Sequence, residues 1–143
     1  MSPWETLPHP TDLRVRVRGR DRRELFAEAV RSTFALMAAP RRGWPATLSG
    51  FETRELRVTG DDAPTLLRRL LSECVFQFES DGFLARDVAL EELSERACRV
   101  RLEGACFAAD DLDVRHVIKA VTWHGLAIQD EPGGVSAEVL HDL

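Results

Sequence analysis

The sequence has 143 residues, 44% hydrophobic and 30% charged, a composition typical of a folded globular protein. Its 19 basic and 24 acidic residues give a net charge of -5, which excludes a general attraction to nucleic acid or anionic membranes. No run approaches the roughly 20 apolar residues that cross a bilayer, and Met1-Ser-Pro-Trp-Glu lacks the basic flank and apolar core of a secretory signal. We therefore expect one cytoplasmic domain over residues 1–143 that does not bind membranes.

Cysteine usage agrees with an intracellular location. Cys74, Cys98 and Cys106 are odd in number, and no two have C-x-x-C spacing. A disulfide framework or a cysteine zinc site is therefore not expected. Each cysteine falls within an apolar pattern, so we expect all three to be small core residues.

The first half of the chain predicts two strands, each followed by a helix. Residues 13–18 alternate between apolar residues and arginine, which is typical of a strand with one buried face. Asp21 and Glu24 form a capping box before an amphipathic helix over 22–38. A second strand is expected over 52–59.

A second helix follows this strand. Asp61 or Asp62 is its expected N-cap, Pro64 suits its first turn, and Asp81-Gly82 ends it. Its apolar stripe is broad, so the helix must pack against a sheet.

The remaining residues have the pattern of four strands. The segment over 117–128 is apolar on both faces and is therefore expected to lie in the centre of the sheet, and Pro132-Gly133-Gly134 predicts a hairpin turn. The expected strands cover 83–90, 98–103, 117–128 and 135–139. The order β-α-β-α-β-β-β-β predicts an α+β fold, a two-layer sandwich with two helices on one face of a mainly antiparallel sheet.

Acidic residues at the two ends of the chain are the main candidates for a site. Asp12 precedes the first strand, and the carboxylate of Leu143 directly follows Asp142 after the last strand. If these strands are neighbours, the three groups could form an oxygen cluster that a hard divalent cation would neutralise. From the spacing alone, two capping aspartates and a free terminus are the simpler interpretation.

Four segments resemble the archease family. His9-Pro10-Thr11-Asp12-Leu13 is similar to its opening H-T-A-D-[VI] motif, and Leu70-Leu71-Ser72-Glu73 with Phe78-Glu79-Ser80-Asp81-Gly82-Phe83 is similar to its L-S-E…F-[DE]-x-[DE]-G-F segment. Ile118-Lys119-Ala120-Val121-Thr122-Trp123-His124 resembles its V-K-A-[VI]-T-[YF]-H strand. Val139-Leu140-His141-Asp142-Leu143 matches its V-x-x-D-[IL] terminus. The order and spacing agree over nearly the whole chain.

The resemblance implies an accessory protein rather than an enzyme. Archeases assist the RtcB-type RNA ligase, which joins a 2′,3′-cyclic or 3′-phosphate end to a 5′-hydroxyl in tRNA splicing and RNA repair. They promote guanylylation of the ligase on its active-site histidine, allow multiple turnover and widen its use of nucleotide cofactors. RNA is thus expected to be a partner only through the ligase.

The resemblance also assigns roles to individual residues. It implies that Asp12, Asp142 and the carboxylate of Leu143 bind a divalent metal, for which Ca²⁺ is favoured and Mg²⁺ or Mn²⁺ are alternatives. Lys119 matches the lysine of the family's strand motif and either contacts the ligase or its nucleotide, or balances the carboxylates. Glu73 is expected to support the site or to cap a sheet contact, and His9 to orient Asp12.

Three departures from the family pattern concern the partner surface more than the fold. Pro10 stands where threonine is usual, Arg14 replaces a glycine, and Gly125 replaces a glutamate. Two other functions stay open. One is a metal-dependent phosphate-processing enzyme that uses the Asp12–Asp142 cluster. The other is an RNA-binding, chaperone-like module, whose arginines would be Arg14, Arg16, Arg18, Arg99 and Arg101.

Overall fold

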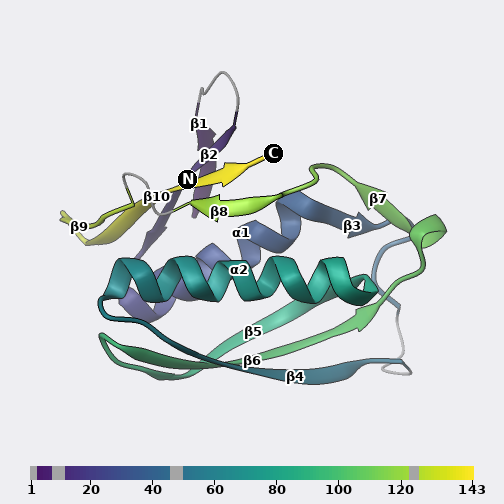
Figure 1. Cartoon of the computed structure of the whole chain (residues 1–143), viewed down its shortest axis with the longest axis horizontal. Coiled ribbons are helices and arrows are strands. Elements are labelled where there is room, and N and C mark those ends of the chain that lie inside the picture. Colours follow the sequence, from purple (N-terminus) through teal and green to yellow (C-terminus); the bar gives the residue numbers. More distant parts are fainter. Residues whose placement is uncertain (1–2, 8–11, 46–49, 123–125) are drawn as a thin grey trace.

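The structure, a computed structural model, describes residues 3–7, 12–45, 50–122 and 126–143. In Figure 1 two helices lie between two antiparallel sheets. The first sheet has the order β1-β2-β10-β8, with β9 also paired to β10. Its strands are β1 (Trp4–Leu7), β2 (Leu13–Gly19), β8 (Ala120–Thr122), β9 (Ile128–Glu131) and β10 (Gly134–Asp142).

The second sheet is formed by the middle of the chain. Its order is β4-β6-β5, and its strands are β4 (Glu52–Thr59), β5 (Phe83–Leu93) and β6 (Ala97–Cys106). A small third pair joins β3 (Ala38–Pro40) to β7 (Leu112–Val114), which follows a 3₁₀ turn over Ala109–Asp111.

Side-chain caps begin both helices. Helix α1 (Arg22–Met37) begins where the carboxylate of Asp21 accepts a hydrogen bond from the N–H of Glu24 at 2.8 Å. Helix α2 (Ala63–Asp81) begins in the same way, with Asp62 accepting from Thr65 N–H at 2.8 Å. Asp62 rather than Asp61 is therefore the N-cap of α2.

The helices share one continuous hydrophobic core with both sheets. Helix α1 contacts β2 and β10 of the first sheet and β5 of the second, and α2 contacts β4, β5, β6 and β8. Phe34 of α1 packs edge to face against Phe83 of β5, with ring centroids 6.1 Å apart. Within the described ranges, no helix is long and apolar enough to cross a membrane.

The α+β class and the antiparallel pairing predicted from the sequence are confirmed, but the layering differs. The strands form two main sheets, and the helices contact both. The reason lies in α1, where the consecutive residues Leu25, Phe26 and Ala27 are all buried. A helix buried on this much of its circumference needs apolar surface on more than one side.

The strand expected over 117–128 is also different. Only Ala120–Thr122 forms a strand before the described part of the chain breaks off at 123, and Val117 is 64% exposed. Ile118, Val121 and Leu126 are nevertheless buried, so most of the described large apolar residues of this segment do pack into the core, without forming a long central strand.

Candidate metal and partner site

The end of the first sheet brings together residues from the two ends of the chain. Strand β10 pairs with β2 so that His141 lies opposite Leu13. Continuing this register by one residue places Asp12 opposite Asp142. In an antiparallel pair such directly opposed residues are close enough for their side chains to interact. The pairing of the first and last strands, on which the predicted oxygen cluster depends, is thus present.

Lys119 joins the same sheet end from the other side of β10. Asp142 lies opposite Ala120 of β8, and the backbone N–H of Lys119 donates to the carbonyl oxygen of Asp142 at 2.7 Å. The side chains of Lys119 and Asp142 are exposed, and Asp12 and Leu143 are half-buried. Three neighbouring strands thereby bring the main chains of Asp12, Asp142 and Lys119 to one end of the sheet, although Lys119 is one residue out of step with the partner of Asp142 and strand alternation directs its side chain to the opposite face.

The donors at this edge suit a hard cation. Carboxylate oxygens are the preferred ligands of Ca²⁺, and Asp12 and Asp142 can supply up to four of them. Among the described residues, no three His, Cys, Asp or Glu side chains form a group that could hold a metal ion. The two aspartates therefore have suitable chemistry but do not by themselves make up a cation site.

The other two predicted site residues have a weaker connection with this edge. Glu73 is exposed on α2, and no described residue forms an ion pair with it. Helix α2 packs against β8, which follows Lys119, so Glu73 belongs to a neighbouring element rather than to the sheet edge. His9 lies outside the described residues, as do Pro10 and Gly125.

Comparison with known proteins identifies the family. A sequence model of the Archease protein family matches residues 4–143. The chain belongs to the archease family. The archease of Methanopyrus kandleri is 31% identical over 99% of both chains, and that of Methanosarcina barkeri is 28% identical over 98% of this chain and 95% of its own.

Solved structures of archease-type proteins have the same fold. The solution structure of protein 1598 from Methanobacterium thermoautotrophicum superposes with a TM-score of 0.78, covering 100% of both chains at 25% identity. The crystal structure of a Thermotoga maritima archease, described as a possible chaperone, gives a TM-score of 0.66 over 97% of this chain and 96% of its own. Its 14% identity supports the fold alone.

One buried polar residue beside the candidate site was not singled out by sequence reasoning. His141 is fully buried on the face of β10 that carries Val135, Ala137 and Val139, and neither ring nitrogen has a hydrogen-bond partner among the described residues. Burial, and secondarily the charge of His116, lower the pKa of His141 to about 4. A neutral imidazole therefore lies on the inner side of the sheet, directly before Asp142. The alternation of β10 is the sequence signal for its burial.

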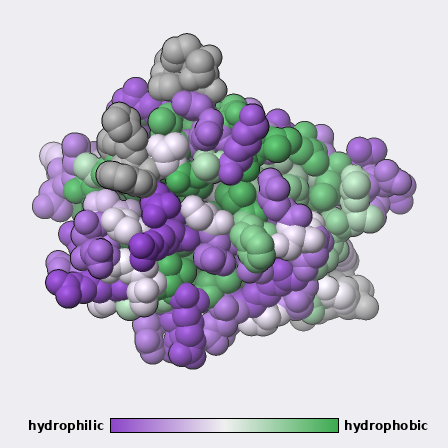
Figure 2. Space-filling model, viewed as in Figure 1, coloured by the Kyte–Doolittle hydropathy of each residue, from purple (hydrophilic) through white to green (hydrophobic). Residues whose placement is uncertain are grey.

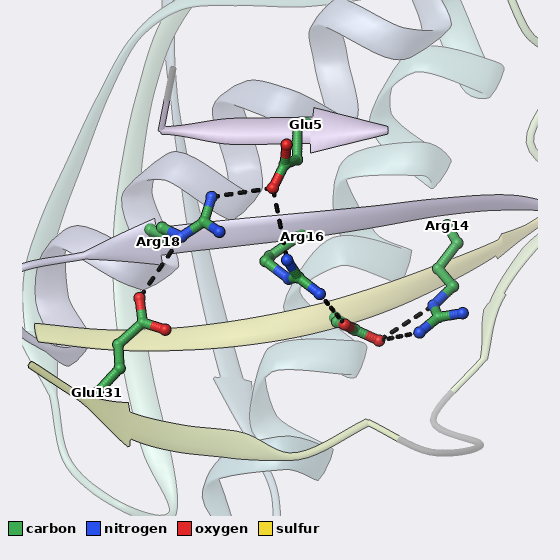
Figure 3. Close-up of polar contacts among 6 residues, drawn as sticks. Glu5, Arg14, Arg16, Arg18 and Glu131 are labelled. Atoms are coloured by element: carbon green, nitrogen blue, oxygen red, sulfur yellow. Dashed lines mark hydrogen bonds and ion pairs between the residues drawn. The ribbon is translucent and has the colours of Figure 1, made fainter. Parts of the chain in front are cut away.

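The arginines considered for RNA binding are paired with glutamates on the first sheet. Figure 3 shows Arg14, Arg16 and Arg18 along β2, on the face turned away from the helices. Arg14 and Arg16 both bind Glu138, with shortest N–O distances of 2.6 and 2.7 Å, and Arg18 binds Glu5 at 3.1 Å. Hydrogen bonds from Arg16 and Arg14 hold the pKa of Glu138 below its usual value.

The second sheet repeats this arrangement. Arg99 binds Glu92 at 2.8 Å, and Arg101 lies 3.7 Å from Glu91. Every arginine of the proposed RNA-binding set thus faces a carboxylate. Phosphate groups would have to compete with these glutamates, which argues against a basic RNA-binding strip on either sheet.

The cysteine prediction holds for two of the three residues. Cys74 and Cys98 are buried, whereas Cys106 is exposed at the end of β6. Its thiol donates to Glu52 at 3.1 Å and accepts from Arg54 at 3.2 Å. The prediction that Cys106 lies in the core was wrong. Cys106 is the last residue of β6, where its thiol lies beside the polar side chains of Glu52 and Arg54.

Proposed function

We propose that this chain is a protein cofactor of an RtcB-type RNA ligase in tRNA splicing or RNA repair. It binds the ligase, promotes its guanylylation and multiple turnover, and performs no chemistry alone. Membership of the archease family supports this role, and the description of the Thermotoga maritima relative as a possible chaperone agrees with an accessory protein. We place the protein in the cytoplasm, where RNA reaches it only through the ligase.

The observation that carries the proposal is the pairing of β10 with β2 and β8. This pairing sets Asp142 between Asp12 and Lys119 at an exposed sheet edge, where a partner can reach all three. An accessory protein needs such a rigid edge more than it needs a deep catalytic cavity. The edge presents charged groups on paired strands, so its geometry is fixed before the partner arrives.

We propose that Asp12, Asp142 and the carboxylate of Leu143 hold a divalent ion, for which Ca²⁺ is the favoured candidate. When bound, the ion offsets two of the three carboxylate charges and fixes the orientation of the carboxylates. Lys119 supplies one further positive charge at this end of the sheet and contacts the ligase or its nucleotide. Its ammonium can donate charge-assisted hydrogen bonds to phosphate groups held by the ligase.

The test is guanylylation and multiple-turnover ligation by the cognate ligase, with and without this protein. We expect turnover to increase at substoichiometric amounts of the wild-type chain, and Asp142→Ala to abolish this increase. Glu138→Gln is the matched control, because it removes a carboxylate from the same strand at a position occupied by Arg14 and Arg16. An active ligase whose turnover does not change would overturn the proposal. Nucleotide hydrolysis by the purified chain would favour the phosphate-processing enzyme instead.

A further inference from the structure

Exposed hydrophobic side chains gather on one side of the molecule. Among the described residues, the exposed large hydrophobics are Phe76, Val114 and Val117, at 61%, 52% and 64%. Val114 and Val117 line a groove of about 420 Å³ whose apolar walls also include Met37, Phe78, Phe107, Leu112 and Ile118. Isolated exposed apolar residues are ordinary, but their concentration around one groove marks an interaction surface.

The groove is formed by two segments that are far apart in the sequence. One wall is the C-terminal turn of α2 over residues 78–82, and the other is the stretch over 107–118 that contains β7. Figure 2 shows hydrophobic residues gathered over the region between β7 and β8 on this face.

The surroundings of the groove are acidic. Glu79 is part of its lining, Asp110 and Asp111 lie in the 3₁₀ turn, and Asp113 lies between two lining residues. None of these four carboxylates forms an ion pair with a described residue, in contrast to the glutamates of both sheet faces. Two arginines also lie nearby and donate to main-chain oxygens: Arg115 to the carbonyl of Ala35 at 3.4 Å, and Arg41 to the carbonyl of Leu112 at 3.3 Å. Neither of these described residues forms an ion pair with the four carboxylates.

The groove leads to the site at the sheet edge. Ile118 lines the groove and is 1% exposed, and the next residue, Lys119, donates its N–H to Asp142. A partner bound in the groove therefore reaches the Lys119–Asp142 edge without crossing another element.

We propose that this surface, termed the Val117 groove (Phe78, Glu79, Asp110–Val114 and His116–Ile118), docks an apolar segment flanked by basic residues on a partner protein. The apolar walls bury hydrophobic side chains, and the unpaired carboxylates attract Lys or Arg beside them. RNA does not fit, because its phosphates would face like charges. A second copy fits poorly, since a two-fold interface would oppose the same acidic residues. The identification of this partner with the ligase rests on the proposed function.

A first experiment tests the groove without the ligase. Two amphipathic peptides with identical leucine positions, one with lysines and one with glutamates, are titrated into the isotope-labelled full chain and followed by NMR. We expect the lysine peptide to shift amide signals of the groove segments, and Val117→Asp to weaken its binding about tenfold. Shifts confined to another face, or equal binding of the two peptides, would overturn the proposal.

A second experiment uses the cognate ligase. We expect Val117→Asp and the double variant Asp110→Lys, Asp111→Lys each to weaken ligase binding about tenfold. Glu95→Lys is the matched control, because Glu95 is 82% exposed and its contact with Arg22 is 4.0 Å long. Val117 is exposed, so an unchanged melting temperature verifies the fold of its variant.

The outcomes separate the two proposals. If the lysine peptide binds in the groove but the ligase does not bind the chain, the docking proposal is supported and the proposed ligase function is refuted. If the ligase binds wild type and Val117→Asp equally, the groove is refuted as its docking surface while the function stands. A dimer in sedimentation that Val117→Asp dissociates would assign the groove to a second copy and overturn our choice of occupant.

Discussion

The backbone N–H of Lys119 donates a 2.7 Å hydrogen bond to the carbonyl oxygen of Asp142, so these residues are joined through their main chains. Their side chains are exposed and take no part in this bond. Strand pairing therefore fixes the main chains of both residues, while their charged side chains are available to a ligand or a partner. This separation allows each charge to be removed without breaking the sheet.

Lys119→Ala is expected to impair function without loss of stability. The main-chain bond to Asp142 survives, so the free energy of unfolding should change by less than about 0.5 kcal/mol, as is usual at exposed positions. If the ammonium contacts the ligase or its nucleotide, ligase activation should fall about tenfold, roughly 1.4 kcal/mol. Thermal unfolding and multiple-turnover ligation measure the two effects.

Lys119→Arg is the control for charge alone. It should restore activation if the lysine only balances the carboxylates, and should fail to do so if the compact ammonium makes a specific contact. Full activation by both Lys119→Ala and Lys119→Arg would contradict any role for this residue.

Asp142→Asn is expected to weaken binding of Ca²⁺ about 10- to 100-fold, because it removes one anionic donor from a site built of carboxylates. Isothermal titration calorimetry of the chelator-treated protein measures the affinity directly. Calcium should raise the melting temperature of wild type, since a ligand that binds only the folded state stabilises it. Glu138→Gln should bind Ca²⁺ like wild type, and an equal loss in both variants would refute a local site.

The sequence alone predicts the local elements well but not their partners in space. The caps at Asp21 and Asp62 begin the helices close to the expected positions, because a cap depends on a few adjacent residues. The pairing of β2 with β10 joins the two ends of the chain, and no local pattern determines it. From the sequence alone, an approach of Asp12 to Asp142 therefore depends on the assumption that the first and last strands are neighbours. The register of β2 with β10 shows that they are.

Local sequence patterns also do not reveal which side chains pair across neighbouring strands. Arg14 and Arg16 alternate with apolar residues, which predicts an exposed face but not that Glu138 would neutralise both. The Val117 groove illustrates the opposite case. The sequence predicts Val117 in a central strand, because periodicity does not distinguish a hydrophobic residue buried within the fold from one that is exposed.

The burial of His141 should make the free energy of unfolding depend on pH. Its pKa is lowered by burial to about 4, below the ordinary value of 6.5, so the unfolded state binds a proton more readily than the folded state. The contribution of His141 to stability is therefore fully present above about pH 6.5 and is lost as the pH falls toward 4. Between pH 7 and 5 this residue should account for a loss of about 2 kcal/mol in the free energy of unfolding.

His141→Leu should remove this part of the pH dependence. Since neither ring nitrogen has a hydrogen-bond partner in the described part of the chain, an apolar replacement leaves no described partner group unsatisfied and should not destabilise the protein at pH 7. Urea unfolding of wild type and variant at pH 5 and 7, both with chelator present, gives the comparison. Identical losses in the two proteins would show that His141 is not protonated on unfolding in this range.

Cys106 is expected to react slowly despite its exposure. Burial of the sulfur, and then the hydrogen bond to Glu52, raise its pKa to about 12, so little thiolate is present at pH 8. Glu52→Gln should lower this pKa and increase the rate of reaction with a thiol reagent severalfold. The buried Cys74 and Cys98 should stay unreactive until the protein unfolds, which gives an internal control. Rapid modification of wild-type Cys106 would argue against this environment.

Gly82→Ala is expected to destabilise the protein strongly. Gly82 ends α2 with a φ of 73°, a conformation that costs residues with a Cβ about 1–2 kcal/mol. An added Cβ would also overlap the carbonyl oxygen of Phe107, whose N–H donates to Gly82 at 3.1 Å. Gly43→Ala separates the two effects, because Gly43 has a similar φ of 74° but no atom within 4 Å of the added Cβ. Urea unfolding should therefore give a greater loss for Gly82→Ala, and equal losses would mean that α2 and β6 can move apart at Phe107.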